Sequence, residues 1–198
     1  MNDEAQVRKT VAGRSCGDCS LCCKLPQIDE LEKPEGVWCR HCAPRRGGCR
    51  IYDTRPTPCR VFYCSWMVDA DVGPEWRPLT AKMVVYFEPA ASRLSIRVVP
   101  EHPDAWRREP YYSQIKRWSR AAVEARQQVV VYIRRRVIVI LPDKDVDFGD
   151  VELGDQIWIG ARETPVGRTW SAVKIPRDLP QEQVSGWIAS QVAAQAGG

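Results

Sequence analysis

The sequence contains no hydrophobic segment as long as a membrane-spanning helix, which needs about 18 consecutive apolar residues. Its two most apolar stretches, 129–133 and 137–141, are separated by three arginines at positions 134–136. The first nine residues contain no apolar segment of the kind found in a signal peptide. These absences predict a soluble, cytoplasmic protein that has no contact with a membrane.

The sequence also lacks the short motifs that identify common catalytic sites. It contains no glycine-rich dinucleotide or phosphate-binding fingerprint and no nucleophile elbow. The run Asp143-x-Asp145-x-Asp147 begins like a calcium-binding loop. Phe148 and Gly154 stand where that loop requires glycine and glutamate, so we interpret the run as an acidic turn. No catalytic residue can therefore be assigned, and whether the chain is an enzyme stays open.

Cysteine is absent after position 64, yet nine cysteines lie between positions 16 and 64. A hydrophobic core needs no such density of sulfur in one segment. In a reducing cytosol, clustered cysteines bind metal more often than they form disulfides, and an odd number cannot be fully paired. The rest of the composition is ordinary, with 44% hydrophobic and 27% charged residues and a net charge of +4. The cysteine-rich segment therefore predicts a metal or iron–sulfur site.

The spacing of the cysteines leaves the metal open. Cys16, Cys19 and Cys22 are three residues apart, as at the start of bacterial ferredoxin ligation, where a more distant cysteine completes a 4Fe–4S cluster. The sequence Cys39-Arg40-His41-Cys42 forms a second C-x2-C pair, which is typical of zinc sites. His41 is a less favoured ligand than the cysteines. The cofactor is therefore expected to be an iron–sulfur cluster of the 4Fe–4S type or zinc.

A longer pattern resembles a known family. It runs Cys16-x2-Cys19-x2-Cys22-Cys23, then Cys39-x-His41, then Gly48-Cys49-x-Ile51-Tyr52-x2-Arg55-Pro56-x2-Cys59-Arg60-x-Phe62-x-Cys64. It is similar to the CxxCxxCC family of zinc- or iron-chelating domains, which includes the flagellin lysine N-methylase. The resemblance covers residues 16–64 only, so it does not carry methylase activity to this chain.

The resemblance implies eight metal ligands and excludes Cys42, because family members often have leucine at that position. The implied ligands are Cys16, Cys19, Cys22, Cys23, Cys39, Cys49, Cys59 and Cys64. Eight thiolates are enough for one centre or for two, and the sequence does not assign them to centres.

Two basic regions accompany this pattern. Residues 40–60 contain six arginines against one acid, and we interpret them as neutralising the charge of the thiolates. They are Arg40, Arg45, Arg46, Arg50, Arg55 and Arg60. The triplet Arg134–Arg136, at the tip of an expected hairpin, is the best surface for an acidic partner.

The fold class predicted from the sequence is α+β. We expect a frayed segment 1–14, a Cys-rich lobe 15–78 with few regular elements, and a mixed lobe 79–198. Period-two alternation and β-branched residues predict strands at 82–88, 94–98, 129–133, 137–141, 156–160 and 169–175. Apolar residues three and four apart predict helices at 111–127 and from about 180, with Asp178 as N-cap. Two similar pentapeptides at 146–155 read as consecutive tight turns.

The predicted function is therefore a metal-binding protein with a Cys-ligated iron–sulfur or zinc centre. One alternative is an iron–sulfur-dependent modifying or redox enzyme related to the flagellin methylase, marked by an iron with three cysteine ligands that faces a pocket. Another is a zinc-stabilised adaptor for RNA or an acidic protein, marked by a contiguous basic surface around Arg134–Arg136. A protein partner is possible, and nucleic acid is not favoured.

Overall fold

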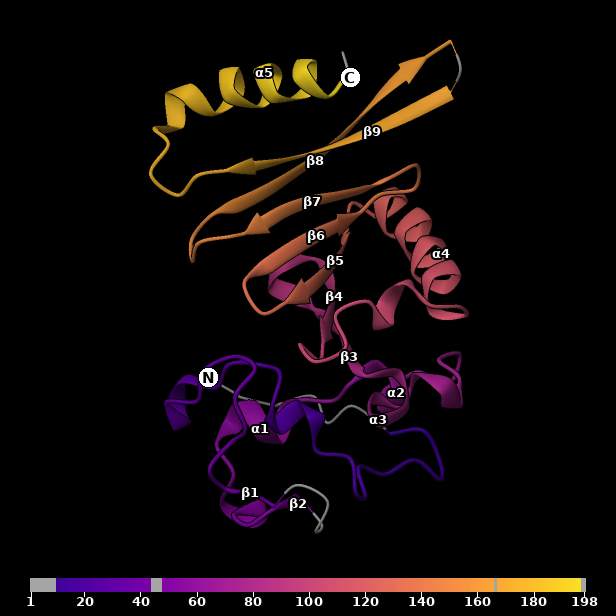
Figure 1. Ribbon diagram of the computed structural model, residues 1–198, viewed down its shortest axis with the longest axis vertical. Coiled ribbons are helices and arrows are strands. Elements are labelled where there is room, and N and C mark those ends of the chain that lie inside the picture. Colours follow the sequence, from indigo (N-terminus) through magenta and orange to yellow (C-terminus); the bar gives the residue numbers. More distant parts are fainter. Residues whose placement is uncertain (1–9, 44–47, 166, 197–198) are drawn as a thin grey trace, which may run out of the picture.

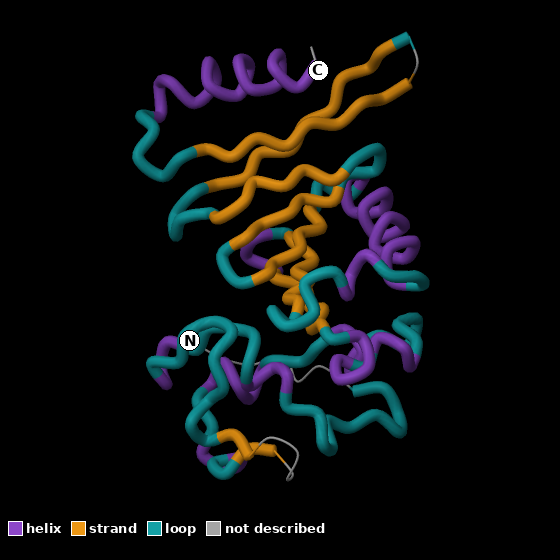
Figure 2. Tube along the Cα trace, in the orientation of Figure 1, coloured by secondary structure: helices purple, strands orange, loops and turns teal. Residues whose placement is uncertain are grey.

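The computed structural model describes residues 10–43, 48–165 and 167–196. It confirms the α+β class, with short elements in the Cys-rich part and regular strands and helices after it (Figures 1 and 2). The Cys-rich part lies at one end of the long axis, and the C-terminal helix lies at the other (Figure 1). Within these ranges, no helix combines the length and the hydropathy needed to cross a membrane.

The Cys-rich part, by which we mean residues 15–81, contains only very short elements. They are helices α1 (Thr57–Val61), α2 (Ser65–Val68) and α3 (Pro78–Ala81), and strands β1 (Cys42–Ala43) and β2 (Gly48–Cys49). A proline stands in the first turn of α1 and of α3, where its missing N–H removes no helical hydrogen bond. Little of this part is therefore held by regular backbone hydrogen bonds.

A five-stranded sheet follows, in the order β3-β4-β5-β6-β7. Its strands are β3 (Met83–Glu88), β4 (Arg93–Val98), β5 (Gln128–Ile133), β6 (Arg136–Ile140) and β7 (Asp145–Asp150). Neighbouring strands are antiparallel except β4 and β5, which are parallel and connected through α4 (Tyr111–Glu124). A parallel pair needs such a crossover. The first four predicted strands and the central helix are confirmed, with small shifts at their ends.

One face of the sheet packs against α4 (Figure 1). Alternate strand residues such as Ile96 and Val131 meet Ile115 of the helix, and all three are 0% exposed. The buried Ser119 hydroxyl of α4 donates to the carbonyl of Ile140 at 2.7 Å, so this polar group is satisfied within the core. The sheet region therefore has a conventional hydrophobic core.

The opposite face of the sheet is covered in part by a separate ribbon. Strands β8 (Gln156–Thr164) and β9 (Gly167–Ile175) form this antiparallel pair, and it packs on Val130 and Val139. Helix α5 (Val184–Ala196) contacts β9 in turn, and the Trp187 indole donates to the carbonyl of Lys174 at 2.9 Å. The last two predicted strands and the C-terminal helix are confirmed.

Two local predictions are wrong. Asp178 is not an N-cap, because residues 176–179 form a turn and the helical segment begins after Pro180 without a side-chain cap. Residues 146–155 are not consecutive turns, because the first half belongs to β7. Val146 and Phe148 are two residues apart and both pack toward the ribbon. Burial of every second side chain favours a strand over two turns.

The Cys-rich part lies over β3 on the same face of the sheet as the ribbon β8–β9. Leu21 and Leu25 share a small buried cluster with Val84 and Val99. Residues 1–9 of the predicted frayed segment lie outside the described residues. Within its remainder, the Val11 amide donates to the carbonyl of Met67 at 2.9 Å, so this stretch is attached to the Cys-rich part. The boundary between lobes at 78 and 79 stays a prediction.

Candidate metal centre

All nine cysteines have free thiols. Within the described ranges, the structure contains no group of three or more His, Cys, Asp or Glu side chains in a geometry that could hold a metal ion. The thiols nevertheless lie in two adjoining groups, which we call the first and the second group. The first group is Cys16, Cys19, Cys22 and Cys64, and the second group is Cys23, Cys39, Cys42, Cys49 and Cys59.

The four cysteines of the first group line one small cavity of about 30 Å³. The rest of the wall is largely apolar and is formed by Phe62, Tyr63, Trp66, Met67, Pro78 and Val84. A space of this volume holds one or two water-sized species. Four soft ligands thus line a small space that contains few competing polar groups.

Local turns bring the first three cysteines of this group together. Gly17 has a φ of +48°, which permits the tight turn after Cys16, and the Cys19 amide donates to the carbonyl of Cys16 at 2.7 Å. A 3₁₀ turn, Leu21–Cys23, follows directly. Burial of Leu21 against the sheet anchors this turn, so the chain holds the C-x2-C-x2-C run at the edge of β3.

Cys64 joins the group from a distant part of the sequence. It precedes α2, and its carbonyl accepts the Met67 amide at 2.8 Å. Burial, and to a smaller extent the nearby Cys19 and Cys16 thiols, raise the pKa of the Cys64 thiol to about 11. Phe62 packs edge-on against Tyr86 of β3, with ring centroids 5.0 Å apart, which fixes the segment that carries Cys64.

Backbone hydrogen bonds assemble the second group from separate segments. The Cys39 amide donates to the carbonyl of Cys23 at 2.9 Å, and the Cys42 amide donates to the carbonyl of Cys39 at 2.9 Å. Cys42 and Cys49 are direct cross-strand partners in the pair β1–β2. Cys59 lies in α1, close enough for its thiol to interact with Cys23, Cys39 and Cys49. The group therefore contains one thiol more than a tetrahedral site uses.

The environment keeps several of these thiols protonated at neutral pH. Burial raises the pKa of the Cys42 thiol to about 11, and the Cys23 thiol adds to this effect. The pKa of Cys23 is raised by its contact with the Cys22 thiol and by burial. For Cys59, burial and then the neighbouring thiols raise the pKa. Metal binding must therefore release protons, as is usual for thiolate sites.

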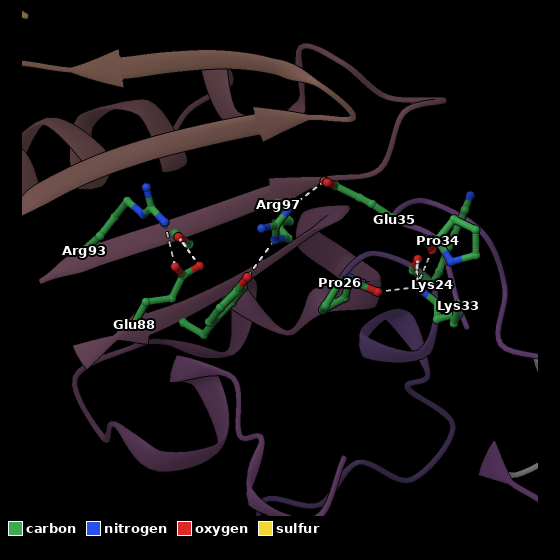
Figure 3. Close-up of polar contacts among 10 residues, drawn as sticks. Lys24, Pro26, Lys33, Pro34, Glu35, Glu88, Arg93 and Arg97 are labelled. Carbon is green, nitrogen blue, oxygen red and sulfur yellow. Dashed lines mark hydrogen bonds and ion pairs between the residues drawn. The ribbon is translucent and has the colours of Figure 1, made fainter. Parts of the chain in front are cut away.

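A buried lysine stands beside the second group. Lys33 is 4% exposed, and its ammonium donates to the carbonyls of Lys24 at 2.7 Å, Pro34 at 3.0 Å and Pro26 (Figure 3). Burial lowers its pKa, whereas the nearby Cys39 and Cys23 thiols raise it. The sequence analysis missed Lys33, because nothing in its local sequence distinguishes it from a surface lysine.

Two arginines act directly on the cysteines. Arg55 lies over the Tyr52 ring at 3.6 Å and donates to the carbonyl of Tyr52 at 2.9 Å. Burial raises the pKa of Cys16, Cys59 and Cys19; the charge of Arg55 partly offsets this rise at Cys16 and Cys59, and the charge of Arg77 does so at Cys19. These contacts agree with the charge-neutralising role expected for arginine here. The predicted Arg45 and Arg46 lie outside the described residues.

Trp66 is a second residue that sequence reasoning missed. Its side chain lines the cavity of the first group, and its indole Nε1 is buried without a hydrogen-bond partner among the described residues. The guanidinium groups of Arg14 and Arg77 lie 5.5 and 5.9 Å from the centre of its ring. A buried N–H without an acceptor is rare in native proteins. Trp66 therefore combines a place in the cavity wall with an indole N–H that is available to a further acceptor.

The structure places all eight predicted ligands in these two groups. It also places Cys42 in the second group, although the resemblance excludes it. No protein-family model, curated protein or solved structure matches the chain. The likeness to the CxxCxxCC family therefore stays a resemblance over residues 16–64.

The basic triplet is not a free cationic surface. Arg135 is paired with Glu152, and Arg136 is paired with Asp147 of β7. Glu152 and Asp147 thus neutralise two of the three arginines. The acidic residues of the rejected calcium loop are likewise used elsewhere, since Asp143 accepts the Trp170 amide at 3.1 Å.

Proposed function

We propose that the protein binds metal through the first group, and that the favoured form is a 4Fe–4S cluster held by Cys16, Cys19, Cys22 and Cys64. The observation that carries the proposal is that these four thiols line one apolar cavity, although Cys64 is 42 residues after Cys22 in the sequence. Three closely spaced cysteines with one distant cysteine are the ligand pattern of such clusters.

The chemistry of the surrounding residues fits a sulfur-ligated metal. Thiolates are soft ligands that suit iron–sulfur clusters and zinc. The unpartnered Trp66 N–H and the nearby Arg77 and Arg55 charges offer the outer hydrogen bond and the charge compensation that thiolate centres require. When bound, a cluster supplies one-electron transfer, whereas zinc supplies structural order.

A single ion is the second candidate, because it fits the cavity of about 30 Å³ as it stands, whereas a cluster requires the cysteine segments to move apart. In either form, metal binding orders a region with few regular elements. The proposed compartment is the cytoplasm, which keeps thiols reduced, because all nine cysteines are free.

The two other functions receive less support. An enzyme needs room for substrate beside the metal, and the larger cavity of about 270 Å³ lies instead between β8, β9 and α5, near Trp158 and Arg162. An adaptor for RNA or an acidic protein needs free basic residues, whereas Arg135 and Arg136 are paired. We therefore propose no substrate and no partner.

Anaerobic purification followed by analysis of iron, acid-labile sulfide and zinc tests the proposal. We expect iron and sulfide with visible charge-transfer absorption in the wild type, and their loss in Cys19→Ser. Zinc in the first group, lost in Cys19→Ser, would identify the single-ion form instead. A wild-type protein that takes up neither metal after anaerobic reconstitution would refute metal binding by the first group.

A further inference from the structure

Cys42 is the cysteine on which the sequence evidence conflicts, because its C-x2-C spacing from Cys39 is typical of zinc sites. The resemblance excludes it, since family members often have leucine there. A buried free cysteine can act simply as a small hydrophobic residue. The question is therefore whether the surroundings of Cys42 are those of a core residue or those of a ligand.

The surroundings are sulfur and a hydroxyl rather than an apolar core. Cys42 is 7% exposed, yet it belongs to none of the three hydrophobic clusters of the described residues. Its thiol interacts with the thiol of Cys23 and with the hydroxyl of Ser20, which is 4% exposed. Leucine could make neither polar contact. The burial of Cys42 is thus burial among potential ligands.

The backbone also arranges Cys42 as half of a ligand pair. Cys39 and Cys42 are separated by two residues, and the amide of Cys42 closes the turn onto the carbonyl of Cys39. The amide of Cys39 fastens the same turn to Cys23. Two cysteines in one tight turn with a third cysteine alongside are typical of structural zinc sites.

Positive charge is available for such a site. A zinc ion bound by four thiolates has a net charge of about −2. The buried ammonium of Lys33 interacts with Cys39 and Cys23, and Arg55 interacts with Cys59. Both cations lie close to thiols of the second group, so they would compensate the negative charge of a buried zinc–thiolate centre there.

We infer that Cys42 is a ligand of a second centre, separate from the first group, in which Cys23, Cys39 and Cys42 bind one zinc ion and Cys49, the cross-strand partner of Cys42, completes the tetrahedral site. The inference rests on the proposed use of these cysteines for metal, but it does not depend on the metal in the first group. It assigns a ligand that the resemblance excludes.

The test compares metal content and chelator competition in full-length Cys42→Leu, Cys42→His and wild type. Leucine keeps the site apolar, and histidine can replace a cysteine as zinc ligand. We expect wild type to hold a zinc ion that Cys42→Leu loses or binds at least about 100-fold more weakly, with recovery in Cys42→His. Cobalt substitution should show fewer thiolate ligands at this site in Cys42→His than in wild type.

Cys19→Ser separates this inference from the proposed function. It should remove the metal of the first group and leave the second-group zinc in place. If Cys42→Leu binds zinc with unchanged stoichiometry and affinity, Cys42 is not a ligand. If Cys19→Ser and Cys42→Leu each abolish the same single ion, there is one centre and the inference is wrong. Loss of zinc in Cys42→Leu alone, with no metal in the first group, would sustain the inference while refuting the proposed function.

Discussion

The sheet region, residues 83–175, and the Cys-rich region, residues 16–64, are stabilised in different ways. The sheet region has a five-stranded sheet, the two-stranded ribbon β8–β9 and side chains such as Ile96 and Val131 with no exposed surface. In the Cys-rich region the described strand pairing amounts to the two-residue pair β1–β2 and one isolated bridge, and its apolar contribution is a small cluster around Leu21 and Leu25. Small segments with so little core usually depend on disulfides or metals. Since the thiols are free, this comparison is the basis for testing whether the proposed metal stabilises the Cys-rich region.

The largest expected effect of a single core substitution is in the sheet region. Ile96→Ala should lower the free energy of unfolding by about 2–5 kcal/mol, because it leaves a cavity between β4 and α4. Denaturant unfolding of protein with and without metal should show the same loss. Leu153→Ala is the matched control, because Leu153 is 89% exposed and its truncation should change stability little. An effect of Ile96→Ala that disappears when metal is removed would contradict an independent sheet core.

The next effect concerns the buried ammonium of the Cys-rich region. Lys33→Met keeps the aliphatic stem but leaves the carbonyls of Lys24, Pro26 and Pro34 without their donor, at a cost of about 1.5–3 kcal/mol. It should also weaken metal binding by the second group, whose thiols interact with Lys33. Lys82→Met is the control, because Lys82 donates to one carbonyl, that of Leu79. Equal losses in the two variants would show that Lys33 is an ordinary lysine.

A smaller effect is expected at the first group. Trp66→Phe removes the indole N–H beside the cavity, so it should shift the visible absorption or reduction potential of the metal centre without removing the metal. Trp106→Phe is the control, because the Trp106 indole N–H is also buried without a partner but Trp106 does not line the cavity of the first group. Identical spectra of Trp66→Phe and wild type would show that this N–H does not reach the centre.

The smallest effect is expected on the surface of the sheet region. The hydrogen bond from Arg136 holds the pKa of Asp147 below its ordinary value. The ion pair therefore stabilises the fold fully at a pH above the ordinary pKa, and this stabilisation is lost as the pH falls through the lowered pKa. Asp147→Asn should cost at most about 1 kcal/mol near neutral pH and nothing in strong acid. Unfolding measured against pH checks this. A difference that persists in strong acid would show that the carboxylate charge is not the cause.

The sheet region could be predicted well from the sequence, because its strands and α4 follow from alternation and helical periodicity. Strand β7 could not, since Gly149 and three aspartates obscure the alternation of Val146 and Phe148, and it is their burial by the ribbon that favours a strand. The start of the last helix could not be predicted to the residue either. Residues 176–179 form a turn, so the helical segment begins after Pro180 rather than after Asp178.

The candidate site was predictable in its residue types but not in its grouping. Spacing identified Cys16, Cys19 and Cys22 as neighbours, whereas the addition of Cys64 depends on how α2 packs on β3. Lys33 and Trp66 could not be predicted, because their roles follow from burial beside thiols that are distant in sequence. The resemblance excluded Cys42 although its spacing pairs it with Cys39, and the position of this pair beside Cys23 follows only from the fold.

Hydrogen–deuterium exchange of anaerobically prepared protein, with its metal and after chelation, tests the central claim most directly. We predict that chelation increases exchange strongly at amides within residues 16–64, including the Cys19, Cys39 and Cys42 amides that close the turns. Amides of β4, β5 and β6 should keep their protection, because the sheet core needs no metal. Unchanged exchange in residues 16–64 after complete removal of metal would contradict the claim that metal orders the Cys-rich region.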